Sequence, residues 1–185
     1  MNAQMYFSPN GGDFWKSRWL FVLSFLALIW LVPGSCHAQM NNNHLLLSGS
    51  FLYERGLDAS IAYEHSGKYH HSWEYFAAYY IQYDDDPNAG HITRKSFWNN
   101  YNTWHVGIAY KPCVSRGRNH HGNARLGASA GSDMSSFRGA LHVGYEHSYA
   151  LKGGWELFFR VKEDVVFQAR DVFRTGVSLG VKCPL

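Results

Sequence analysis

The stretch FRGALHVGYEHSYAL, residues 137–151, decides the fold of this 185-residue chain. Alternate residues from Phe137 to Leu151 are apolar or aromatic, apart from Gly139 and His147, and the residues between them are small, polar or charged. A period of two residues is typical of a β-strand, because successive side chains point to opposite faces. The stretch therefore predicts a long strand with one apolar face and one polar face.

The same alternation recurs on both sides of this stretch. It predicts seven further strands, over residues 45–53, 57–65, 72–83, 104–111, 124–131, 155–162 and 173–185. Turn-forming pairs such as Arg55-Gly56 and Gly153-Gly154 separate neighbouring strands. The sequence therefore predicts an all-β chain of eight antiparallel strands.

The polar face indicates what kind of barrel these strands form. Charged residues of the seven clearest strands all lie on that face: Asp58, Glu64, Glu74, Lys111, Arg125, Arg138, Glu146, Lys152, Glu156, Arg160, Lys162, Arg174 and Lys182. Glycines also gather there. A narrow lumen needs small residues beside long charged ones, whereas glycine weakens a strand exposed to water. The pattern favours an outer-membrane barrel with its apolar face toward lipid. A soluble periplasmic barrel is the alternative.

Aromatic residues support the membrane interpretation. The chain has 12 Tyr, 12 Phe and 7 Trp, and many of them fall near strand ends. Outer-membrane barrels carry girdles of aromatic residues at both membrane interfaces. The predicted interfacial aromatics are Tyr63, Trp73, Tyr83, Trp104, Tyr110, Tyr145, Tyr149 and Trp155. The fold prediction is an eight-stranded antiparallel up-and-down β-barrel of outer-membrane type in a Gram-negative bacterium.

The lumen of such a barrel is expected to hold ion pairs. Eight strands enclose a space that side chains fill, and a buried charge without a partner costs several kcal/mol. We therefore predict pairing between four glutamates and four arginines. They are Glu64, Glu74, Glu146 and Glu156 on one side and Arg125, Arg138, Arg160 and Arg174 on the other.

The first 38 residues have the pattern of a cleaved signal peptide. Lys16 and Arg18 precede the apolar run 20–32, and small residues follow it. Cleavage after Ala38 leaves a barrel domain over residues 39–185. Lipidation at Cys36 is the alternative.

Other function classes find little support. A net charge of +3 gives no electrostatic case for nucleic-acid binding. Tyr-Glu-His-Ser occurs at 63–66 and 145–148 and suggests a hydrolase, but neighbouring strand residues point to opposite faces. The same divergence separates the histidine pairs at 70–71 and 120–121, and no carboxylate or cysteine completes a metal site there. We therefore predict no catalytic residue, no metal, no cofactor and no small-molecule substrate.

Several segments resemble a known family. The closing segment Val161 to Leu185 is similar to the end of the conjugal transfer protein TraO family of Bacteroides-type conjugative transposons. Residues 62–65 and 144–146 and the aromatic strand 73–83 also resemble that family.

The resemblance implies a role in conjugal DNA transfer and no known catalytic residue. It leads us to expect a non-enzymatic envelope component whose partners are outer-membrane lipid and other proteins of the transfer apparatus. A surface or adhesion barrel that binds a protein or glycan through its outer loops is the alternative. A lipid-modifying enzyme is a third, weaker hypothesis.

Overall fold

The computed structural model describes residues 43–98, 101–133, 135–169 and 172–185. Strands account for most of them. Their bounds are β1 (Asn43–Leu52), β2 (Gly56–Ser66), β3 (Ser72–Gln82), β4 (Asn102–Lys111), β5 (Cys113–Arg116), β6 (His120–Ser132), β7 (Phe137–Ala150), β8 (Glu156–Val166) and β9 (Phe173–Pro184). The predicted signal peptide over residues 1–38, and the alternative of lipidation at Cys36, lie outside the described residues.

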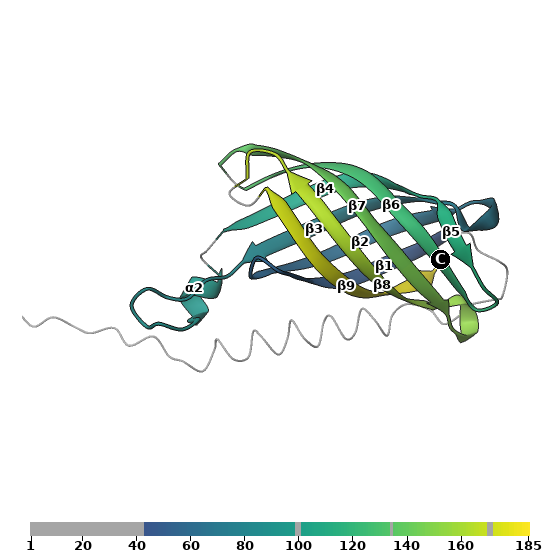
Figure 1. Cartoon of the computed structure of the whole chain (residues 1–185), viewed down its shortest axis with the longest axis horizontal. Coiled ribbons are helices and arrows are strands. Elements are labelled where there is room, and N and C mark those ends of the chain that lie inside the picture. The colour runs from purple at the N-terminus through teal and green to yellow at the C-terminus, as the bar shows by residue number, and fades with distance from the viewer. Residues whose placement is uncertain (1–42, 99–100, 134, 170–171) are drawn as a thin grey trace, which may run out of the picture. The chain divides into compact units, whose positions relative to one another are not determined.

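The strands form one closed sheet in which all pairs are antiparallel. The last strand pairs with the first, with Leu45 opposite Cys183 and Leu52 opposite Gly176. On the other side, β4 pairs with β6, with Trp104 opposite Ser132. Figure 1 shows the strands running diagonally around the barrel, the tilt that closure of a twisted sheet requires.

The short strand β5 corrects one sequence prediction. The predicted strands over residues 104–111 and 124–131 leave residues 112–123 outside the sheet, but β5 pairs with the beginning of β6, with Cys113 opposite Asn123 and Arg116 opposite His121. Pro112 separates β4 from β5, because proline lacks the N–H that a ladder requires. Since β5 continues β4 along the same partner, the described residues form a barrel of eight strands with one interrupted member.

The connections divide between two ends of the barrel. The terminus end carries η1 (Lys68–His70), η2 (Lys152–Gly154) and the β5–β6 turn. Leu185 N donates to Asn43 O there at 3.0 Å. The loop end carries the other connections, including the β3–β4 connection with α2 (Arg94–Trp98) beyond the barrel rim (Figure 1). Among the described residues, no helix is long and apolar enough to cross a membrane.

Burial in the barrel is inverted relative to a water-soluble protein. Apolar side chains such as Leu141, Val143 and Leu157 are exposed on the outside, whereas Glu146 and Lys182 are buried inside. A soluble protein has no reason to expose so many large apolar residues while it buries charges. This arrangement confirms the predicted eight-stranded antiparallel barrel of outer-membrane type.

Candidate functional site

The half of the lumen nearer the terminus end holds a connected set of buried charges, called here the lumen cluster. Its members are Glu64, Glu74, Lys111, Arg125, Glu146, Glu156, Arg160 and Lys182. They project inward from β2, β3, β4, β6, β7, β8 and β9 because each occupies a polar-face position of its strand. The cluster therefore links seven strands of the barrel wall through side-chain ion pairs.

Two carboxylates organise the centre of the lumen cluster. Glu74 accepts hydrogen bonds from Arg125 Nε at 3.0 Å and Nη2 at 2.9 Å, from Arg160 Nη2 at 2.8 Å and from Lys111 Nζ at 3.0 Å. Glu146 accepts from Arg160 Nη2 at 2.6 Å and from Lys111 Nζ at 2.7 Å. Charge-assisted bonds of this kind are the strongest side-chain hydrogen bonds.

Lys182 connects the outer members. Its Nζ lies 2.9 Å from Glu146 Oε1, 3.0 Å from Glu64 Oε1 and 3.6 Å from Glu156 Oε2. Lys111 also contacts Glu64. The cluster thus balances four carboxylates with four cations, so every buried charge has an opposite neighbour, as desolvation requires.

The composition of this cluster corrects the predicted network. Glu64, Glu74, Arg125, Glu146 and Arg160 do come together in the structure. The sequence reasoning did not include Lys111 and Lys182 among them. Glu156 contacts Lys182 and, at 3.8 Å, His121, where an arginine was expected.

Two arginines of the predicted ion-pair network lie outside the lumen cluster, at the opposite end of the lumen. Arg138 pairs at 2.6 Å with Asp133 of the β6–β7 turn. Arg174 donates to Thr103 Oγ1 at 3.2 Å. Both are the second residues of strands that start at the loop end, whereas Lys111 and Lys182 lie at or near the ends of strands that finish at the terminus end. The position of each residue within its strand was the sequence signal that could have excluded Arg138 and Arg174 from the lumen cluster and included Lys111 and Lys182.

An apolar cluster packs beside the lumen cluster in the interior of the barrel. Leu46, Ala62, Phe76, Ala109 and Phe158 form it. The Phe76 ring faces the Arg125 guanidinium, 4.6 Å from its centroid, and meets the His142 ring edge-on at 5.1 Å. The lumen is therefore packed with side chains across its middle.

Beyond Phe76 lies a second polar arrangement, called here the histidine chain. Its members are Ser129, His142, Asp164, Lys162 and Asp58. Ser129 Oγ lies 2.7 Å from His142 Nε2, and His142 Nδ1 lies 2.6 Å from Asp164 Oδ1. Lys162 Nζ bridges Asp164 at 3.0 Å and Asp58 at 2.7 Å. The sequence prediction assigned Asp164 to a loop over 163–172, but β8 continues pairing with β7 up to Val166, which places this carboxylate inside the barrel.

Serine, histidine and aspartate in this order are also the parts of a hydrolytic triad. Close packing beside Ser129 argues against an acyl-enzyme, however. A methyl group placed on Gly107 would lie 2.6 Å from Ser129 Cβ and 2.7 Å from Phe76, so β4 packs directly against the hydroxyl-bearing residue. The geometry therefore favours a structural hydrogen-bond chain.

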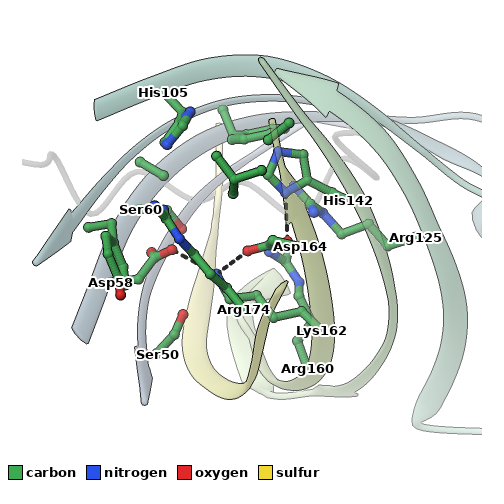
Figure 2. Close-up of a pocket in the computed structure, with 15 residues that line it drawn as sticks. Ser50, Asp58, Ser60, His105, Arg125, His142, Arg160, Lys162, Asp164 and Arg174 are labelled. Carbon is green, nitrogen blue, oxygen red and sulfur yellow. Dashed lines mark hydrogen bonds and ion pairs between the residues drawn. The ribbon is translucent and has the colours of Figure 1, made fainter. Parts of the chain in front are cut away.

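A small cavity lies at the loop end beside the histidine chain (Figure 2). Its volume is about 30 Å³, and its lining includes Asp58, His105, His142, Asp164 and Arg174. This loop-end cavity has space for about two water-sized groups. It is too small for a lipid, a sugar or a nucleic acid strand.

Most of the predicted interfacial aromatics are exposed on the outer surface: Tyr63, Trp73, Trp104, Tyr110, Tyr145, Tyr149 and Trp155. All of these except Trp104 belong to the half of the wall nearer the terminus end. Tyr83 differs, since it is half-buried and stacks on Phe97 of α2 with 5.9 Å between ring centroids.

The histidines of the terminus end meet as stacked rings. His70 stacks on His121 at 4.6 Å and His120 on His147 at 5.1 Å between centroids. Within the described ranges, no group of three or more His, Cys, Asp or Glu residues is arranged to hold a metal ion.

No protein-family model and no curated protein matches this chain. Two solved structures resemble it. One comes from the de novo design of transmembrane β-barrels, with 10% identity and a TM-score of 0.47 over 78% of this chain and 95% of that one. The other is Neisserial surface protein A (NspA), with 14% identity and a TM-score of 0.49 over 77% of this chain and 94% of that one. Neither likeness carries an inference about function, so the assignment to outer-membrane-type barrels rests on the closed pairing and inverted burial described above.

Proposed function

We propose that this protein is an outer-membrane anchor or scaffold in a conjugative DNA-transfer apparatus, without enzymatic activity of its own. The observation that carries the anchoring role is the filled lumen of a barrel whose outside is apolar. Glu74 and Arg160 cross the lumen, and Phe76 and Phe158 pack beside them. The apolar outer surface anchors such a barrel in the lipid bilayer. The side chains that fill its lumen leave no passage for DNA.

The assignment to conjugation rests on the resemblance of residues 161–185 to the closing segment of the TraO family. A scaffold acts by presenting loops to other proteins of the apparatus. The β3–β4 connection suits that role, since Trp98 at its end is 58% exposed. Its partners in this proposal are outer-membrane lipid and other transfer proteins.

Internal hydrogen bonds tie residues 86–96 of that connection together. Asp86 accepts from Asn88 N at 3.0 Å and from Thr93 Oγ1 at 2.9 Å. Thr93 and Ser96 cap α2 reciprocally, with N-to-Oγ distances of 2.9 and 3.2 Å. Because the backbone is already ordered, a partner binds without a large loss of conformational entropy.

Two experiments test the proposal. Membrane fractionation followed by heated and unheated gels is expected to place the protein in the outer membrane as a heat-modifiable band. Deletion in a donor cell is expected to reduce mating to the background of a transfer-deficient strain, with recovery on complementation by wild type. Unchanged mating in the deletion strain, with the protein shown in the outer membrane of the parent, would remove the conjugation role and retain the barrel.

The exposed apolar side chains of the β3–β4 connection also suit the alternative, a surface barrel that binds a protein or glycan. Trp98 and Ile92 are both exposed there. A Trp98→Ser variant separates the two functions. Loss of mating with normal cell attachment supports the scaffold, and loss of attachment with normal mating supports adhesion. Arg118→Gln, at the terminus end, is the matched control on the other side of the barrel.

A further inference from the structure

Arg174 is the charged residue at the loop end of the lumen that has no carboxylate within ion-pair distance among the described residues. It is the second residue of β9, points inward and is 3% exposed. Its guanidinium carbon lies 3.8 Å from the centroid of the Tyr80 ring. Stacking of this kind covers one face of the guanidinium and leaves its N–H edges to select a partner.

The hydrogen bonds of Arg174 are incomplete. Nη1 donates to Thr103 Oγ1 at 3.2 Å, whereas Nε and Nη2 have no acceptor within the described part of the chain. The two carboxylates of the loop-end cavity are already engaged, Asp58 by Lys162 and Asp164 by Lys162 and His142. A buried cation whose N–H groups lack acceptors is unfavourable, because it has lost its hydration without full replacement.

His105 adds a third buried nitrogen without a partner in the described part of the chain, and this Nδ1 is a donor in one tautomer of the ring. Thr103 Oγ1 accepts from Arg174, which can only donate, and also lies 3.0 Å from His105 Nε2. If the Thr103 hydroxyl donates its single proton to Nε2, the neutral ring carries its own proton on Nδ1. In a protonated ring Nδ1 is also a donor. Nδ1 is buried and has no partner among the described residues.

The cavity thus offers two unpaired N–H donors on Arg174, and a third on His105 when Nδ1 carries the ring proton. Arg174 Nε, Arg174 Nη2 and His105 Nδ1 all belong to residues that line it, and Figure 2 shows both side chains at the cavity wall. The matching ligand accepts hydrogen bonds, donates none and carries a negative charge. A volume of about 30 Å³, space for about two water-sized groups, limits that ligand to a small anion such as a halide ion.

We propose that the loop-end cavity binds one small monovalent anion, held by Arg174 and His105. The site is independent of the transfer role, because it needs only the residues inside the barrel. Anion binding gives a counter-ion in direct contact to the guanidinium, which lies beyond ion-pair distance of every described carboxylate. It so strengthens the loop end of the barrel in the way that the lumen cluster strengthens the terminus end. Water would satisfy the same donors without neutralising the charge, and it predicts no dependence on the anion.

Thermal unfolding of the full barrel refolded in detergent tests the site, with chloride compared with gluconate at equal ionic strength. Gluconate is too large to enter a cavity of this size. A chloride concentration ten times the dissociation constant is expected to raise the melting temperature by about 3–6 °C over gluconate. Bromide is expected to act like chloride.

Variants locate the effect. Arg174→Gln removes the buried charge, so it is expected to fold in gluconate and to lose the chloride effect. His105→Phe is expected to reduce it. Arg116→Gln at the terminus end, where the side chain is exposed, is the control for general ionic effects and is expected to keep the full shift.

A bromide anomalous difference map of crystals gives an independent measurement. The expected peak lies within hydrogen-bond distance of Arg174 and His105. Equal melting temperatures in chloride and gluconate overturn the proposal, and so does a chloride effect that Arg174→Gln retains.

Discussion

Arg160 on β8 donates a hydrogen bond of 2.8 Å to Glu74 on β3, the strand on the opposite side of the barrel. Four strand steps separate β3 from β8 in either direction around the wall. The same guanidinium also reaches Glu146 on the neighbouring strand β7, at 2.6 Å. One arginine therefore fixes the width of the lumen and closes it.

Removing the charge of Glu74 is expected to destabilise the barrel strongly. Glu74→Gln leaves Arg125 and Arg160 short of a carboxylate in a buried site, at a cost of about 3–5 kcal/mol. Urea unfolding in lipid vesicles measures the change. Asp85→Asn is the control, because its pair with Arg55 is exposed and is expected to contribute less than about 1 kcal/mol. Equal stability of both variants would contradict the role of the lumen cluster.

A charge on the lipid-facing side is expected to be costly near the middle of a strand. Val143 lies at the centre of β7 and is 52% exposed on the outer surface. Val143→Arg should destabilise the barrel by about 2–4 kcal/mol in bilayers. Leu151→Arg, in the turn that follows β7, is the matched control with an expected cost of about 0–1 kcal/mol. A neutral Val143→Arg would argue for a surface in contact with water.

Glycines that face the lumen are expected to tolerate no side chain. A methyl group on Gly180 would lie 2.5 Å from Leu47 O and 2.5 Å from the Phe158 ring, whereas one on Gly49 meets nothing within 4 Å. Gly180→Ala should therefore cost about 1–3 kcal/mol through overpacking. Gly49→Ala is expected to be neutral in the same unfolding assay, and a similar loss in both variants would point to strand propensity as the cause.

Ser129 is expected to be chemically inert despite its bond to His142. Gly107 packs closely beside it, and Ser129 is not among the residues that line the loop-end cavity. Intact protein in vesicles, treated with a fluorophosphonate probe, should show no added mass on Ser129. Labelling that disappears in Ser129→Ala would identify a reactive nucleophile and revive the hydrolase hypothesis.

The β6–β7 turn at the loop end is expected to respond to acid. Hydrogen bonds from Arg138, Ser135 and Ser136 hold the pKa of the Asp133 carboxyl below its usual range. The hydrogen bonds of the turn favour the ionised form of the Asp133 carboxyl. They therefore stabilise the folded turn fully at a pH above the ordinary aspartate pKa, and this stabilisation is lost as the pH falls through the lowered pKa of Asp133. Carboxyl chemical shifts should report this low midpoint, and Arg138→Gln should raise it; an unchanged midpoint would contradict the pairing.

Alternation alone was enough to predict which residues face inward. Glu74, Arg125, Glu146 and Arg160 all occupy polar-face positions of their strands, and the structure buries them. The reason is geometric, since a strand has a side-chain period of two and therefore only two faces. The prediction that the apolar face of each strand meets lipid followed from the charged residues and glycines, which lie together on the other face.

Pairing partners inside the lumen needed the tertiary structure. Alternation says nothing about height along the barrel axis, which depends on strand tilt and on the register with which β9 closes against β1. That register places Lys111 and Lys182 beside Glu146 and leaves Arg174 at the other end, over Tyr80. The sequence by itself determined the faces of the wall. Only closure of the barrel decided which charges meet and which cation lies apart from every described carboxylate.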